Sequence, residues 1–388
     1  MISALLFAAT VATGTTATVT VGPPGSAFYV PPDPLPARRD GAVVWARRFT
    51  GGPALPSAAV NERILYETIG TSGTFTAVSG TIAIPQGAPP AHGWPVISWA
   101  HGTVGDAPQC APSRSSRPNI EQRMLDGFVR RGYAVAQTDY EGNGTPGIHP
   151  YFVATASARD VTDIVRAARE IDPQIGRTWI VMGHSEGGAA ALATAALGEQ
   201  WAPELHLAGA VAYAPASHVE GILQNEILGD APNSGLVFLG LLIAGFSTVD
   251  PRIDPAQMLE PQALQMMPEL QQRCISDLMN DSDWDRIDPR TIFRPQADED
   301  ALYADLLANS PENFSISVPT LLVQGVADAL VPSEMTIALR DRLCRSGAPV
   351  AFKAYVGATH GSVLAAAAGD VAAWIARRFR GAPAHSTC

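Results

Sequence analysis

A glycine-flanked serine stands at the junction of an apolar segment and an alanine-rich one. The run Trp179-Ile-Val-Met is followed by Gly183-His-Ser185-Glu-Gly187, then by a further glycine and three alanines. In this context Gly-x-Ser-x-Gly is typical of a tight strand-to-helix turn that presents the serine hydroxyl beyond the end of a sheet. Glycine fits positions 183 and 187 because side chains would collide in such a turn. The alternative, a glycine-rich junction without chemistry, is not favoured by these flanks.

Strand-like and helix-like segments alternate along most of the chain. The expected strands are 78–84, 95–100, 133–138, 178–182, 207–213, 318–324 and 351–356, and the expected helices are 119–131, 156–170, 187 onward, 333–345 and 362–380. Near-continuous apolar strands separated by helices indicate a mostly parallel sheet with helices on both faces. The alternation stops between 216 and 313, which predicts a helical cap or lid inserted into an α/β core made of 28–215 and 314–388.

The most apolar part of this insertion is the run from Gly235 to Phe246. Twelve residues are too few to span a membrane as a helix. The run therefore predicts a buried cap helix, and the alternative is a lid or acyl-binding surface over an active site.

A serine nucleophile needs a base, and the base needs a carboxylate that orients it. In the α/β-hydrolase fold, to which the serine motif points, these residues follow in the order Ser, Asp or Glu, His. His360 lies in a loop between the last expected strand and the last helix, whereas His385 lies in a polar tail. Asp328 is in the loop after the preceding strand. We therefore predict Ser185 as nucleophile, His360 as base and Asp328 as its orienting carboxylate.

Hydrolysis of an ester also requires N–H donors for the oxyanion that forms on the substrate. One is expected from Glu186, the residue after the nucleophile. The second is expected from Thr103 or its neighbour Gly102, which follow an early strand; the alternative there is a simple glycine turn. His101 and His149 are interpreted as loop residues, without a catalytic role.

The composition excludes several classes of protein. Hydrophobic residues make up 46% and charged residues 16%, so we expect a large packed core rather than disorder. The net charge is −11 and no basic run is present. Such a chain is poorly suited to nucleic acid or to an anionic membrane surface.

The first residues carry an apolar run of the length of a signal-peptide core, too short for a transmembrane helix. Gly25-Ser-Ala27 would suit a signal peptidase, so residues 1–27 are predicted to be a signal peptide and the protein to be secreted. A misassigned start codon or a frayed apolar tail is the alternative. A proline-rich stretch from Pro31 to Pro36 is expected to form an extended arm.

Four cysteines follow this segment: Cys110, Cys274, Cys344 and Cys388. None has Cys-x-x-Cys spacing, so no metal or redox site is expected. Export favours two disulfides, but four cysteines allow three pairings and spacing does not choose among them.

Several short motifs together resemble the secretory lipases of the lipase A type from fungi and actinobacteria. They are His101-Gly-Thr, Cys110-Ala-Pro-Ser, Asp139-Tyr-Glu-Gly-Asn-Gly-Thr-Pro, Gly183-His-Ser-Glu-Gly-Gly and Gly357-Ala-Thr-His. The resemblance implies an α/β-hydrolase with a large helical cap that acts on carboxylic esters, including triacylglycerols, without a cofactor. It also implies the triad Ser185, Asp328 and His360.

The same resemblance implies that Cys110 bonds to Cys274, which leaves Cys344 to bond to Cys388. Fungal relatives can carry an acidic oxyanion donor in the loop that matches Gly102-Thr103, and this chain has none there.

The predicted function is hydrolysis of a small-molecule or lipid ester, the latter at a lipid–water interface. A serine peptidase or an acyltransferase on the same fold is a second hypothesis, although no propeller-like segment precedes the core. A non-catalytic binding module is a third, and the ordered triad argues against it.

Overall fold

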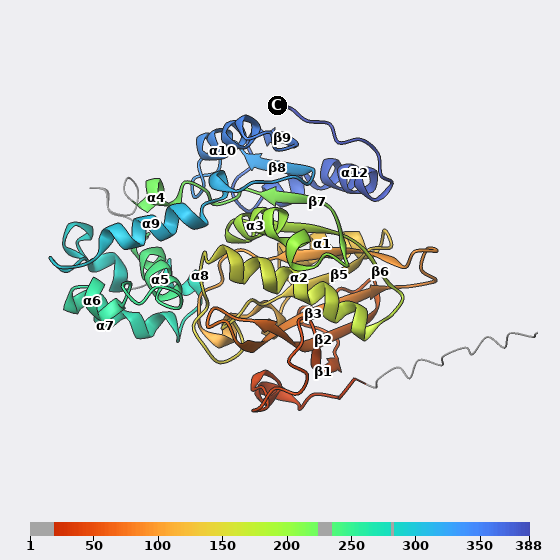
Figure 1. Ribbon diagram of the computed structural model, residues 1–388, viewed down its shortest axis with the longest axis horizontal. Helices are drawn as coiled ribbons and strands as arrows, with labels where there is room; N and C mark the ends of the chain where they lie inside the picture. The colour runs from red at the N-terminus through yellow and green to blue at the C-terminus, as the bar shows by residue number, and fades with distance from the viewer. Residues whose placement is uncertain (1–18, 224–234, 281–282) are drawn as a thin grey trace, which may run out of the picture.

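The computed structural model describes residues 19–223, 235–280 and 283–388, and in this part of the chain the core is one nine-stranded sheet (Figure 1). The strands are β1 (Val43–Arg48), β2 (Ala58–Ile69), β3 (Phe75–Pro85), β4 (Trp94–Ala100), β5 (Ala134–Thr138), β6 (Ile175–His184), β7 (His206–Tyr213), β8 (Thr320–Gly325) and β9 (Val350–Tyr355). Their order is β1-β2-β3-β5-β4-β6-β7-β8-β9. All pairs from β5 to β9 are parallel, which confirms the mostly parallel sheet expected from the sequence.

Two strands at the N-terminal edge of the sheet were not predicted. β2 runs antiparallel to β3 from the pair Ala58↔Pro85 to the pair Ile69↔Phe75, and β1 adds to its other side. The centre of β2 reads Asn61-Glu-Arg63 and is half-buried, so it lacks the continuous apolar character of the inner strands. A strand of this kind is specified by its pairing partners more than by its own hydrophobicity.

Helices cover both faces of the sheet, as predicted. They are α1 (Ile120–Val129), α2 (Ala154–Ile171), α3 (Glu186–Trp201), α10 (Ser333–Arg345), α11 (Val363–Ala366) and α12 (Ala368–Phe379). The apolar sides of α2, α3 and α10 share one core cluster with one face of the sheet, and those of α1, α11 and α12 share another cluster with the opposite face. The prediction of a single helix over 362–380 is wrong in one respect, because the chain forms two helices there, joined at Ala367.

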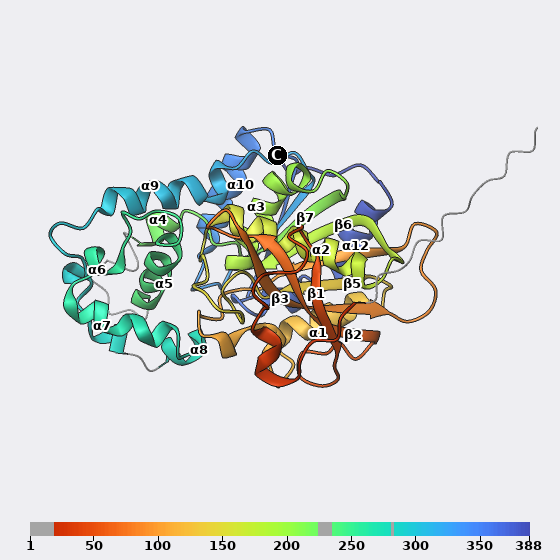
Figure 2. The same ribbon diagram turned by 60° about the horizontal axis from the view of Figure 1, so that its bottom comes forward.

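The segment between β7 and β8 lies to one side of the sheet in both views (Figures 1 and 2). Its helices are α4 (Val219–Ile222), α5 (Leu236–Phe246), α6 (Pro255–Met258), α7 (Pro261–Leu270), α8 (Ile275–Leu278) and α9 (Glu299–Asn309). Their buried side chains form a cluster of their own, with α5 at its centre. A Cβ on Gly240 would lie 2.6 Å from the fully buried ring of Trp284, so glycine lets this ring pack directly on α5. We propose 216–313 as the bounds of this cap.

Two disulfides join distant segments. Cys110, in the loop after β4, bonds to Cys274 at the start of α8, and the Ile275 N–H beside it donates to the Val104 carbonyl at 2.9 Å. The cap is therefore tied covalently to the loop that follows β4. These two cysteines form the pair that the family resemblance implies.

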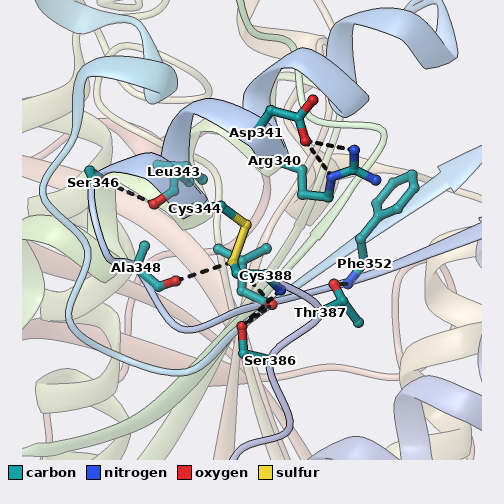
Figure 3. Close-up of a disulfide and its surroundings, with 11 residues drawn as sticks. Arg340, Asp341, Leu343, Cys344, Ser346, Ala348, Phe352, Ser386, Thr387 and Cys388 are labelled. Carbon is teal, nitrogen blue, oxygen red and sulfur yellow. Dashed lines mark hydrogen bonds and ion pairs between the residues drawn. A yellow bond between two sulfur atoms is a disulfide. The ribbon is translucent and has the colours of Figure 1, made fainter.

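The second disulfide holds the C-terminal tail (Figure 3). Cys388 bonds to Cys344 in α10, and the Thr387 N–H donates to the Val350 carbonyl at 2.8 Å. The tail thus covers the start of β9, which is an edge strand, and protects part of it from pairing with other chains.

Residues 19–29 pack against β1. The Ala46 N–H donates to the Thr20 carbonyl at 2.9 Å, the Gly22 N–H donates to the Ala46 carbonyl at 3.0 Å, and Phe28 is buried. Most of the predicted signal peptide, 1–27, lies outside the described residues; cleavage before Phe28 would remove the part that pairs with β1. No helix within 19–223, 235–280 and 283–388 is both long and apolar enough to cross a membrane.

Candidate active site

Ser185 occupies the turn between β6 and α3. Its φ is +59° and its ψ is −120°, a conformation that residues other than glycine rarely adopt. The turn is held by backbone bonds: the Ser185 N–H donates to Tyr213, and the Ser185 carbonyl accepts from Gly188, Ala189 and Ala216. These bonds over-determine the strained conformation, as is common at functional sites.

The glycines of the motif are required by close backbone approaches. A Cβ on Gly183 would lie 1.8 Å from the Gly187 carbonyl oxygen, and a Cβ on Gly187 would lie 2.0 Å from the Ala100 carbonyl oxygen. A side chain at Gly183 would push α3 away from the end of β6, and one at Gly187 would push it away from the end of β4; in either case Ser185 would move.

His360 and Asp328 lie together, on the loops after β9 and β8. His360 Nδ1 is 2.7 Å from Oδ2 of Asp328. The other Asp328 oxygen accepts from the N–H groups of Leu330 and Val331, both at 2.9 Å. Burial alone would raise the pKa of the Asp328 carboxyl, but the bonds from His360 and from these N–H groups lower it below its usual value. An ionised Asp328 fixes the proton on Nδ1 of His360, so Nε2 is left to act as a base.

Ser185 and His360 line the same cavity, which has a volume of about 550 Å³. Within the described residues no hydrogen bond joins the Ser185 hydroxyl to His360. Such catalytic bonds are often long in unliganded sites and tighten when substrate binds.

His184, which was expected only as a neighbour within the serine motif, contacts His360. Its Nε2 is 2.9 Å from the His360 carbonyl oxygen, and the two rings are 4.4 Å apart. Burial, together with the nearby His360 ring, lowers the pKa of His184 to about 4. His184 is therefore neutral, and its Nε2–H anchors the loop that carries His360. Sequence pattern gave no signal for this contact, because it depends on how two loops pack.

The loop after β4 lies directly beside Ser185. A Cβ on Gly102 would be 3.4 Å from Cβ of Ser185. Burial raises the pKa of the Glu121 carboxyl above its usual value, and the Gly102 N–H, which faces this carboxyl, only partly opposes the rise. In the described chain no hydrogen bond engages the N–H of Thr103 or of Glu186. We therefore propose Thr103 rather than Gly102 as the partner of Glu186 in the oxyanion hole.

Both apolar and polar side chains line the cavity. The apolar ones include Tyr151, Phe152, Val219, Phe238, Leu242, Ile275, Met279, Leu330 and Val331, and the polar ones include Ser115, Asn119, Glu121 and Gln122. Five of these apolar residues come from the cap and the others from core loops. Phe238 and Leu242 of α5 line the cavity, whereas Leu239 packs inside the cap.

The described residues contain no group of three or more His, Cys, Asp or Glu side chains that could hold a metal ion.

Comparisons with known proteins agree with this geometry. A family model described as secretory lipase matches residues 111–387. A secreted triacylglycerol lipase of Malassezia globosa is 25% identical over 394 residues, which cover 94% of this chain and 83% of that protein. A Mycobacterium tuberculosis protein that bears the name of a probable inactive lipase is 25% identical over 393 residues, covering 93% of this chain and 83% of its own.

Among solved structures, lipase A of Candida antarctica superposes with a TM-score of 0.72 at 19% identity, over 93% of this chain and 87% of that one. This likeness, together with the sheet described above, confirms the predicted α/β-hydrolase fold.

Proposed function

Because the chain belongs to the secretory lipase family, we propose that it is a secreted carboxylic-ester hydrolase whose nucleophile is Ser185. The observation that carries the proposal is the meeting of three elements at one cavity. Ser185 projects from a strained turn, His360 is held by Asp328 at 2.7 Å, and both Ser185 and His360 line the cavity wall.

In the proposed reaction His360 Nε2 takes the proton of the Ser185 hydroxyl as its oxygen attacks the ester carbonyl carbon. The carbonyl oxygen becomes an oxyanion, which accepts hydrogen bonds from the Glu186 and Thr103 N–H groups. His360 then protonates the departing alcohol, and an acyl-enzyme remains on Ser185. Water, activated by His360, attacks this ester and releases the acid, which restores the serine.

The proposed substrates are triacylglycerols or other esters with an apolar acyl group. An acyl chain would be buried against Phe238 and Leu242 of the cap and Leu330 of the core. Each buried methylene stabilises the bound state by about 0.8 kcal/mol, so a wall of this kind favours longer chains until its length is filled.

The named M. tuberculosis relative makes loss of activity a concrete alternative for this chain. Labelling with a fluorophosphonate probe distinguishes an active hydrolase from an inactive one, because the probe reacts only with an activated serine. We expect one modified peptide, containing Ser185, and no labelling after substitution of Ser185 by alanine. An unlabelled folded protein would contradict the proposed function.

Rates on p-nitrophenyl esters of increasing acyl length, measured with and without a triglyceride emulsion, define the substrate class. We expect hydrolysis throughout, with higher kcat/KM for medium or long chains than for acetate. A preference for acetate with no action on the emulsion would indicate a short-chain esterase.

A further inference from the structure

The residue that follows the nucleophile carries a buried carboxyl group. Glu186 is 6% exposed, and its N–H is one of the two proposed oxyanion donors. A carboxylate on the donor residue places negative charge close to where the substrate oxygen becomes negative. Like charges in a water-poor site repel strongly, so an uncompensated Glu186 would oppose the reaction.

His149 supplies the compensating group. Its Nε2 is 2.8 Å from Oε1 of Glu186, and its Nδ1 is 3.1 Å from the carbonyl oxygen of Glu141. A carbonyl oxygen can only accept, and so can an ionised carboxylate, so this arrangement suits an imidazolium that donates from both nitrogens. Burial by itself would lower the pKa of His149, but the Glu186 bond, the Asp106 charge and the Glu141 carbonyl raise it to about 9.

Asp106 adds a second buried carboxyl to the same group. It is 1% exposed, and neither of its oxygens has a hydrogen-bond partner among the described residues. Its pKa is raised to about 7, mainly by burial; the His149 charge opposes this rise and the Glu186 charge adds to it. The carboxyls of Glu141 and Asp160 also interact with His149. His149 is thus the cation facing several acidic groups from the loops after β4 and β5, from α2 and from α3.

The ring of His149 also contacts the side chains that support the second donor. It stacks on Tyr140 at 5.4 Å and meets Tyr151 edge-on at 6.0 Å. The Tyr151 hydroxyl lies 2.8 Å from the Thr103 hydroxyl. A single buried side chain therefore connects the residues that carry both proposed oxyanion donors.

We propose that His149 is a positioning residue of the oxyanion hole, which as an imidazolium neutralises the Glu186 carboxylate and fixes the Glu186 and Thr103 donors. This inference rests on the proposed ester hydrolysis. His149 does lie in a loop, as the sequence indicated, but it is 3% exposed and not a simple surface residue. In this proposal, the Gly-x-Ser-x-Gly turn can carry an acidic residue after the serine because the positive charge of His149 lies beside it.

The test is a charge-swap series in the full chain, measured as kcat and KM on p-nitrophenyl butyrate at pH 7.5. His149→Gln retains a donor for Glu186 but removes the positive charge, and we expect kcat to fall about 10- to 100-fold with KM little changed. The double variant His149→Gln/Glu186→Gln removes both charges and keeps a hydrogen bond. It is expected to recover at least tenfold over His149→Gln. His92→Gln, on an exposed turn, is the matched control and should match the wild type.

If His149 had a purely structural role, the double variant would be less active than His149→Gln, because the destabilising effects of two buried substitutions would add. A double variant no more active than His149→Gln would overturn the proposal. If His149→Gln does not fold, the pH dependence of the wild type decides. The kcat on tributyrin should fall as pH rises through about 9, where His149 loses its proton. In Glu186→Gln that fall should disappear; a fall that persists there would also overturn the proposal.

Failure of this inference is distinguishable from failure of the proposed function. A wild type that neither hydrolyses esters nor reacts with fluorophosphonate contradicts the function itself. A wild type that does both, with no recovery in the double variant, contradicts only the role of His149.

Discussion

Nδ1 of His360 lies 2.7 Å from Oδ2 of Asp328, although the two residues come from separate loops at the ends of neighbouring strands. β8 and β9 are parallel and in register, from Thr320↔Val350 to Gly325↔Tyr355, so their carboxyl ends meet at the same edge of the sheet. Ser185 follows β6 at that same edge. The parallel sheet thereby brings together residues that are far apart in the chain.

The first prediction concerns Asp328. Asp328→Asn should leave the fold intact and lower kcat about 10⁴-fold, because an amide allows the wrong tautomer of His360 to form. Steady-state kinetics with thermal unfolding checks both parts. His385→Ala, in the exposed tail, should leave kcat within a few-fold of the wild type. If the tail histidine were the damaging change instead, the base would be misassigned.

Where sequence could predict the site, it did so through local patterns. The turns that carry Ser185, Asp328 and His360 directly follow β6, β8 and β9, and each of these strands contains a segment that the sequence indicated as a strand. The order of strand, turn and helix thus indicated which side chains reach the sheet edge, without any knowledge of the tertiary contacts.

The remaining features depend on packing between distant segments. Asp106 and His149 occupy polar loops and have no local signal of burial; they are enclosed only when α3 and the loops after β4 and β5 meet. β2 was missed because Asn61, Glu62 and Arg63 interrupt its apolar pattern. The face of α5 that lines the cavity could not be separated from the face that packs inside the cap, since the whole run is apolar.

A second prediction uses these two faces of α5. Leu242 lines the cavity and Leu239 does not, yet both are fully buried in the cap. Leu242→Ala should change the ratio of kcat/KM between octanoate and butyrate esters. Leu239→Ala is the matched control: it should destabilise the protein by about 2–5 kcal/mol and leave that ratio unchanged. Equal effects of the two variants on the ratio would show that α5 does not contact the acyl chain.

The third prediction concerns stability and pH. The folded protein raises the pKa of Asp106 to about 7, so the fold retains a proton that the unfolded chain releases near pH 4. Asp106 therefore lowers stability progressively as pH rises from about 4 to about 7. Asp106→Asn should increase the free energy of unfolding by on the order of 3–4 kcal/mol at pH 8 and by little at pH 4. Urea titrations at both pH values test this; a gain independent of pH would contradict it.

The fourth prediction separates the two disulfides. Cys110 and Cys274 are 164 residues apart in the sequence, and their disulfide joins the cap to the loop beside the cavity. Cys344 and Cys388 are 44 residues apart in the sequence, and their disulfide does not join the cap to that loop. Removing either pair by alanine substitution should destabilise the protein by about 2–5 kcal/mol. Only loss of the first pair should also lower kcat/KM on long-chain esters. Full activity of a Cys110→Ala/Cys274→Ala variant would show that the cap needs no covalent tie.

The central claim, that Ser185 is the nucleophile of an ester hydrolase, is tested most directly by Ser185→Ala. Initial rates on a p-nitrophenyl ester are compared with those of the wild type, and circular dichroism and thermal unfolding verify that the variant is folded. We predict a loss of about 10⁶-fold in kcat, the usual consequence of removing a triad serine. A folded variant that retained a tenth or more of the wild-type rate would contradict the assignment.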